Sequence, residues 1–251
     1  MSWPLLASYR RLLASRLDWF ATLSRSAARR IRPLQERTPA ESQALWESML
    51  PLIRDDLIHL HSVRARFELL VDASKGSSIP QPNHILDFVA GLYASEMLLG
   101  IRRQTDRDRR TASMRRLMAD LATYPQHASR DWYVTKYSSS MQEIAHRTFD
   151  GFSRRDGDAY VDPKRIHSDL ASLSDVTAAI TRFANSRVAH LSATGPAPAV
   201  TFSELQIAVE TFEHLLRRYY LLVDGRGLSE ATPTMQFDFL HPLSVPWVDR
   251  S

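Results

Sequence analysis

Apolar residues recur along most of the chain at spacings of three and four positions, which is the pattern of amphipathic α-helices. The pattern predicts helices over residues 3–30, 38–71, 83–103, 111–124, 129–149, 163–190 and 201–225. No run of alternating apolar and polar residues is long enough to predict a strand or a hairpin. The expected fold class is therefore all-α, in the form of a helical bundle.

Specific sequence signals mark the ends of several of these helices. Residues 38–41 and 201–204 each begin with Thr and end with Glu, the spacing of a capping box. An Asp-Pro pair at 162–163 provides an N-cap and a first-turn proline, and Gly225 is placed to end the last helix. These signals favour separate helices joined by short polar loops.

Two helices carry apolar faces that we expect to be buried in the core. In the helix over 83–103 the expected core residues are Ile85, Phe88, Val89, Leu92, Met97 and Leu99. In the helix over 201–225 they are Leu205, Val209, Phe212, Leu215, Leu216, Tyr219 and Leu222. Both helices should therefore be central to the bundle.

The expected organisation has three parts. Residues 1–80 should form N-terminal helices that pack on or extend the bundle, and residues 81–225 should form the bundle itself. Residues 226–251 combine three prolines with Phe237, Phe239 and Trp247. A free tail rarely carries so much aromatic surface, so we expect an extended aromatic tail packed on the bundle.

Composition narrows the chemistry. The 251 residues are 44% apolar and 24% charged, as in ordinary soluble proteins. The absence of Cys excludes disulfides, thiolate zinc sites and cysteine nucleophiles. The longest apolar stretch, residues 85–101, is interrupted by Asp87 and Glu96, so no membrane span is expected. Together these features favour a cytoplasmic protein.

The basic residues are almost all arginine. The chain has a net charge of +4 and 32 basic residues, of which only Lys75, Lys136 and Lys164 are lysines. Arginine presents a planar fork that binds phosphate bidentately, so this bias suits contact with RNA or DNA. A GC-rich genome would produce the same bias, and both explanations stay open.

The end of the helix over 163–190 carries Asn185, Arg187 and His190 before the chain breaks at Gly195-Pro196. Arg187 and His190 are three residues apart, which places them on one face of an α-helix. An imidazole can take a proton from an RNA 2′-hydroxyl, and a nearby guanidinium can hold the phosphate. Alternatively, both cations simply interact with the negative end of the helix dipole.

A second polar segment follows the apolar helix over 83–103. It reads Arg103-Gln104-Thr105-Asp106 and is followed by five further arginines, at positions 107, 109, 110, 115 and 116. Such a cluster can follow a phosphate backbone. A solvated loop with helix-terminal charges would look the same.

These two segments resemble the HEPN superfamily of all-helical proteins that cut RNA, and most closely its AbiU-like abortive-infection branch. Asn185, Arg187 and the Ala189-His190 step are similar to the Arg-Asn/Asp-x-x-x-Ala-His run of that branch. Residues 103–106 are similar to its Arg-x-Thr-Asp step. The position of the leading arginine holds Ala184. The resemblance covers residues 85–247.

The resemblance implies a HEPN-like bundle that acts in prokaryotic phage defence or as a toxin. It further implies a homodimer with one shared cleft, RNA as a partner, an antitoxin or other protein partner, and no cofactor or metal. The implied activity is that of a metal-independent endoribonuclease. His190 would be the general base, Arg187 the phosphate clamp and Asn185 the orienting group. Supporting roles fall to Arg103, Asp106 and Arg182, and RNA contacts to Arg102, Arg107 and Arg110.

Two other interpretations remain open. A catalytically silent HEPN module would bind RNA or a protein partner, and Ala184 is its best support. A dimeric structural scaffold would have no role with nucleic acid. Among replacements for the missing arginine, Arg187 lies within one turn of His190, whereas Arg182 is about 12 Å away along the axis. Arg182 would therefore act only across a dimer.

Overall fold

The structure is a computed structural model that describes residues 37–75, 84–189, 198–228 and 238–241, with side chains as far as 186 in the second range. Two units, Met1–Arg37 and Thr38–Ser251, make up the chain, and every helix described below belongs to the second. The helix expected over 3–30 and most of the expected aromatic tail lie outside the described residues.

Five longer helices form the bundle. They are α2 (Pro39–Lys75), α3 (His84–Gln104), α4 (Met114–Thr123), α7 (Pro163–Phe183) and α8 (Phe202–Asp224). In the described residues there is no strand, only isolated bridges that join Ser129 to Tyr160 and Ser153 to Val161. The all-α class is thus confirmed.

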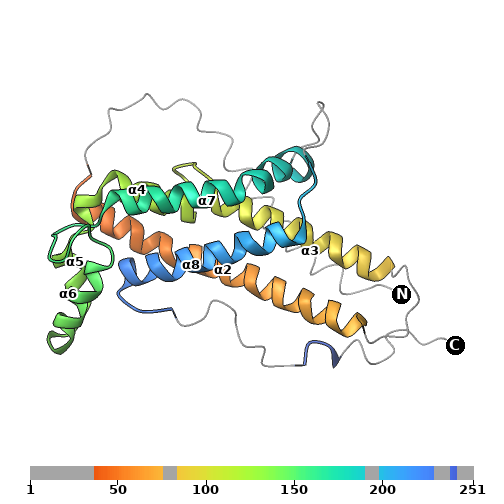
Figure 1. The fold of residues 1–251 in the computed structure, drawn as a ribbon, viewed down its shortest axis with the longest axis horizontal. Coiled ribbons are helices and arrows are strands. Elements are labelled where there is room, and N and C mark those ends of the chain that lie inside the picture. The colour runs from red at the N-terminus through yellow and green to blue at the C-terminus, as the bar shows by residue number, and fades with distance from the viewer. Residues whose placement is uncertain (1–36, 76–83, 190–197, 229–237, 242–251) are drawn as a thin grey trace, which may run out of the picture. The chain divides into compact units, whose positions relative to one another are not determined.

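The helices pack around one apolar core. α2 packs against α3 and α8, while α7 packs against α4, α8 and α3; Figure 1 shows these helices running alongside one another. At the centre, Trp46, Leu57, Met97, Leu117 and Phe212 are each fully buried. Burial of each such side chain contributes roughly 1.5–3 kcal/mol. Because Trp46 and Leu57 come from α2, residues 38–75 belong to the same core as the helices that follow.

The predicted end signals act as expected. At α8, the Thr201 backbone N–H donates to Glu204 Oε2 at 2.7 Å, and the Glu204 N–H donates to Thr201 Oγ1 at 3.2 Å. Thr38 and Glu41 make the same reciprocal pair before α2. Gly225 ends α8 with a φ of 81°, a left-handed conformation that a glycine adopts without a Cβ penalty.

The single helix predicted over 129–149 is wrong. The chain instead forms α5 (Arg130–Val134), a 3₁₀ turn at Ser139–Met141 and α6 (Gln142–Asp150). Three consecutive serines at 138–140 separate the two helices. Serine hydroxyls can compete with the backbone for hydrogen bonds, which disfavours a continuous helix across three serines. Apolar periodicity alone did not show this break.

The N-terminal half of α3 is also less buried than predicted. Met97 is fully buried, but Ile85 is 77% exposed, Phe88 67% and Leu92 56%. On its other side α3 packs by stacking Tyr93 on Phe67 of α2, with ring centroids 4.1 Å apart. Only one face of this half is therefore covered by the described helices.

By length and composition α3 could cross a membrane. It has 21 residues, a window of mean hydropathy 1.3, and only 28% of that window buried. A single helix of this kind is weak evidence, because the core helix of a soluble protein meets the same criteria.

Candidate functional site

The C-terminal end of α3 meets the C-terminal end of α7. Arg102 Nε of α3 donates to Asn185 Oδ1 at 2.5 Å. Close by, the hydroxyls of Thr105 and Thr181 are 3.3 Å apart and share a hydrogen bond. Two polar segments that lie about eighty residues apart in the sequence thus come together at one place.

The helix changes character at this meeting point. α7 ends at Phe183, and Ala184–Ala189 form a π-helical turn. π turns are rare and are frequently found at functional sites. The prediction that Arg187 and His190 share a face assumed α-helical spacing, which this turn does not have. His190 lies outside the described residues, as does the side chain of Arg187.

Ala184, at the position of the missing arginine, faces the core. Its exposed fraction is 0%, like that of Ile180 one turn earlier. Its neighbour Asn185 is exposed and points to Arg102. An arginine at 184 would therefore enter the core instead of the surface where Asn185 lies.

Arg103, for which the resemblance implies a supporting role, is bonded to two carboxylates outside the Asn185 contact. It bonds Asp56 of α2 at 2.9 Å and Glu96 of its own helix at 3.3 Å. Partial burial lowers the pKa of its guanidinium, but the bonds to Asp56 and Glu96 outweigh this and raise it overall. Two carboxylates thus neutralise Arg103, which ties α3 to α2.

Asp106 shapes the loop between α3 and α4. Its carboxylate accepts from the Asp108 N–H at 3.0 Å, and its carbonyl accepts from Ser113 Oγ at 2.7 Å. Asp106 is therefore a loop-forming residue, and within the described residues it forms no ion pair with Arg103.

Gln104 is a residue that sequence reasoning missed. It is 1% exposed, donates from Nε2 to Asp56 Oδ2 at 2.7 Å, and accepts from the Met114 N–H at 3.0 Å. One amide therefore joins α2, α3 and α4. A polar residue at the buried end of an apolar helix was the only available signal.

Residues 102–116 hold seven arginines and two aspartates, so this short segment carries more positive charge than the chain's net +4. The guanidinium and the backbone N–H of Arg110 both donate to the Asp108 carboxylate and lower its pKa to about 2. Arg110 is therefore paired. Arg107 and Arg109 are exposed and form no ion pair within the described residues, and the same is true of Arg182 on α7. Arg102, Arg115 and Arg116 likewise form no ion pair within the described residues, although each donates a hydrogen bond.

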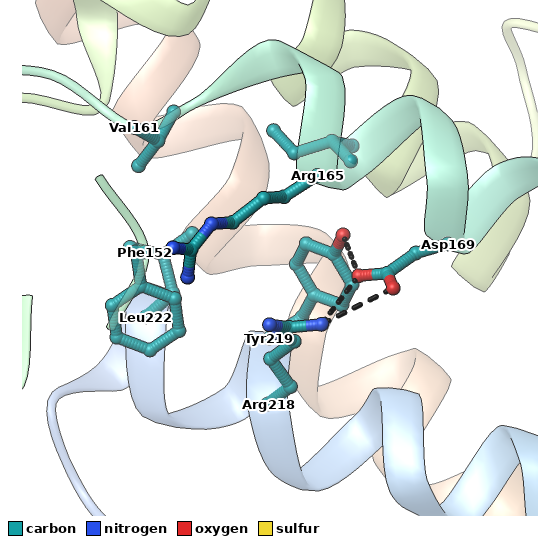
Figure 2. Close-up of a pocket in the computed structure, with 8 residues that line it drawn as sticks. Phe152, Val161, Arg165, Asp169, Arg218, Tyr219 and Leu222 are labelled. Carbon is teal, nitrogen blue, oxygen red and sulfur yellow. Dashed lines mark hydrogen bonds and ion pairs between the residues drawn. The ribbon is translucent and has the colours of Figure 1, made fainter. Parts of the chain in front are cut away.

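Elsewhere, a small hollow lies between the start of α7 and the end of α8 (Figure 2). The hollow has room for roughly one water molecule. Asp169 in its wall accepts from Arg218 at 3.0 Å and from the Tyr219 hydroxyl at 2.8 Å. Burial and the Asp169 charge raise the pKa of Tyr219. These side chains tie α7 to α8. The hollow beside them is too small to hold a nucleotide.

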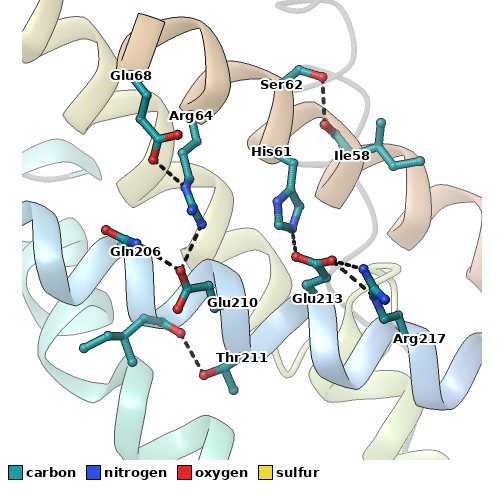
Figure 3. A network of polar contacts seen from close by, with 11 residues as sticks. Ile58, His61, Ser62, Arg64, Glu68, Gln206, Glu210, Thr211, Glu213 and Arg217 are labelled. Carbon is teal, nitrogen blue, oxygen red and sulfur yellow. Dashed lines mark hydrogen bonds and ion pairs between the residues drawn. The ribbon is translucent and has the colours of Figure 1, made fainter. Parts of the chain in front are cut away.

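A second polar network joins α2 to α8 (Figure 3). His61 is 2% exposed, and its Nε2 lies 3.7 Å from Glu213 Oε2. Glu213 also bonds Arg217, while Arg64 links Glu68 to Glu210. Burial lowers the pKa of His61, so the imidazole is neutral near pH 7. This histidine belongs to the core.

In the described part of the chain, no group of three or more His, Asp or Glu side chains is arranged to hold a metal ion. Comparison with protein-family models, with curated proteins and with solved structures finds no match. The meeting of α3 with α7 is therefore the candidate functional site.

Proposed function

We propose that this chain is an AbiU-like HEPN protein, a cytoplasmic and metal-independent endoribonuclease of prokaryotic phage defence or toxin type. The observation that supports it most is the hydrogen bond between Arg102 and Asn185. Arg102 directly precedes residues 103–106, so the bond brings the two segments that carry the sequence resemblance close together. The π turn at Ala184–Ala189 and the arginines of residues 102–116 add support.

The proposed chemistry uses only side chains of the protein and the RNA itself. His190 takes the proton from a 2′-hydroxyl, and the 2′ oxygen attacks the adjacent phosphorus. The bond from phosphorus to the 5′ oxygen breaks, and water donates a proton to that oxygen as it leaves, while His190 returns its proton to solvent. The products are a 2′,3′-cyclic phosphate and a 5′-hydroxyl end. Guanidinium groups stabilise the charge that develops on the phosphate.

The test uses the purified full chain and labelled RNA in EDTA. We expect cleavage that leaves cyclic phosphate ends, and loss of cleavage in His190→Ala. His167→Ala is the matched control, because His167 is an exposed histidine of α7 outside the proposed site. Cleavage by His190→Ala at the wild-type rate would refute the proposal.

The alternative is a catalytically silent module that binds RNA or a protein partner, such as an antitoxin. The buried position of Ala184 favours it, because the usual arginine has no place there. Such a module would bind RNA with salt-sensitive affinity and leave it uncut. Arg107→Gln should weaken that binding more than Arg110→Gln, because Asp108 already neutralises Arg110. Negligible RNA affinity would leave a structural scaffold.

A homodimer is also part of the proposal. In support of it, α3 exposes Ile85, Phe88 and Leu92, which are three and four residues apart and form one stripe. Exposed apolar patches of this kind commonly mark interaction surfaces.

A further inference from the structure

We infer that Arg102, from α3, is the residue that binds the scissile phosphate and so takes the place of the arginine absent at position 184. This inference rests on the proposed endoribonuclease function and identifies a further substrate-binding residue for it. Its basis is the geometry of the α3–α7 meeting point.

The other arginines near the site are less suitable. Arg103 is neutralised by Asp56 and Glu96. Arg182 is exposed but makes no hydrogen bond to Asn185 within the described residues. Arg102 does make one, and comes from a different helix than the Asn185–His190 run. The pattern of a single helix could not have indicated it.

The Arg102–Asn185 hydrogen bond leaves the Nη groups of Arg102 available to donate to a phosphate. It engages only Nε of Arg102, and in the described part of the chain neither terminal Nη group has a partner. Because Oδ1 of Asn185 accepts from Arg102, the Nδ2 of that amide is directed elsewhere and can also donate. A phosphodiester, with two non-bridging oxygens, suits such a set of N–H donors.

The guanidinium is also held in place before any substrate arrives. Arg102 is half-buried and anchored at Nε, so little side-chain freedom remains to be lost on binding. The Thr105–Thr181 hydrogen bond and the Gln104 bridge fix the end of α3 on either side. A donor mounted on fixed helices is aimed more accurately than one on a loop.

The test compares Arg102→Gln and Arg102→Lys with Arg109→Gln in the full chain. Arg109→Gln is the matched control, because it removes the same charge from the same segment at an exposed residue without an ion pair. Single-turnover cleavage in EDTA should fall about 10²–10³-fold in Arg102→Gln. Arg102→Lys should recover part of the rate, because charge returns without the fork. Arg109→Gln should lower the single-turnover rate far less, because Arg109 makes no hydrogen bond to Asn185 within the described residues.

A second measurement, of RNA binding, tests the inference even if the wild type does not cut RNA. An RNA with a 2′-deoxy sugar at the cleavage position cannot be cut, and Arg102→Gln should bind it more weakly than Arg109→Gln does. Equal affinities of the two variants would overturn the inference, whether or not the wild type cuts. Loss of cleavage in His190→Ala with full cleavage in Arg102→Gln would also overturn it, while leaving the proposed function intact. A melting curve checks that each variant folds.

Discussion

The methyl group of Ala184 packs in the core, and its size determines what else fits at that position. An arginine at this position would bring a charged and much larger side chain into an apolar space. A buried charge without a partner costs far more than an exposed one. The HEPN pattern has an arginine at this position, whereas the packing accommodates only a small apolar side chain.

We predict that Ala184→Arg destabilises the protein by about 3–5 kcal/mol, because the charge has no partner in the core. Thermal unfolding should shift down by about 10 °C or more. Ala178→Arg is the control, because Ala178 is exposed on the same helix and should change the melting temperature little. An Ala184→Arg protein with wild-type stability would contradict the burial of this position.

His61 makes stability depend on pH. Its folded-state pKa is lowered by burial, so the unfolded chain binds the proton at higher pH than the folded chain. This part of the stability is present at neutral pH and is lost as the pH falls below the ordinary histidine value of 6.5. Glu213 and Glu210 oppose the shift, while Arg64 and Arg217 reinforce it.

We therefore predict that His61→Leu reduces the acid sensitivity of the fold. Denaturant unfolding at pH values above and below 6.5 should show a smaller loss of free energy in the variant than in the wild type. His59→Leu is the control, because His59 lies two residues before His61 and its side chain is half exposed. This variant should keep the acid sensitivity of the wild type. Parallel pH curves for His61→Leu and wild type would argue against the buried neutral imidazole.

At the scale of helices, local signals were sufficient where both ends of an element are determined by nearby residues. The capping box at Thr201–Glu204 and the glycine at 225 predicted the ends of α8 correctly, and the apolar spacing between them predicted its buried face. The break between α5 and α6 was missed, because apolar spacing continues across the three serines. The Arg102–Asn185 contact was missed because it joins helices about eighty residues apart.

Gln104 shows how one side chain can hold three helices. We predict that Gln104→Met destabilises the protein by about 1–3 kcal/mol, because the Met114 N–H and the Asp56 carboxylate lose their bonds to the amide. Urea unfolding measures this, and Gln126→Met is the exposed control. If the proposed site is correct, cleavage should also fall, since the amide positions the end of α3. Equal stability of the two variants would show that the bridge contributes nothing.

For the molecule as a whole, the sequence indicated that α3 is amphipathic but not which face the other helices would cover. The buried side carries Tyr93 and Met97, and the exposed stripe carries Ile85, Phe88 and Leu92. Periodicity gives the width of an apolar face; the packing of the neighbours determines how much of it is covered. This exposed stripe is the surface at which we propose that a second copy of the chain binds.

We predict that Phe88→Glu converts a dimer into a monomer, because the charge would be placed in the apolar stripe. Light scattering coupled to gel filtration gives the mass of each form. Leu52→Glu is the control, because Leu52 is an exposed leucine of α2 away from this stripe. A monomeric wild type would refute the dimer, and flotation of the wild type with lipid vesicles, lost in Phe88→Glu, would assign the stripe to a membrane.

The π turn at Ala184–Ala189 has a consequence for how the chain opens. The start of α7 is held by the Asp162 cap and by the Asp169–Arg218 pair, whereas the π turn that follows α7 departs from regular α-helical bonding. Backbone amides of this π turn should therefore exchange with deuterated solvent faster than those near Ile166 and Leu173. Opening would start at the end that carries the proposed site, so bound RNA should slow exchange there while the rest of α7 keeps its protection.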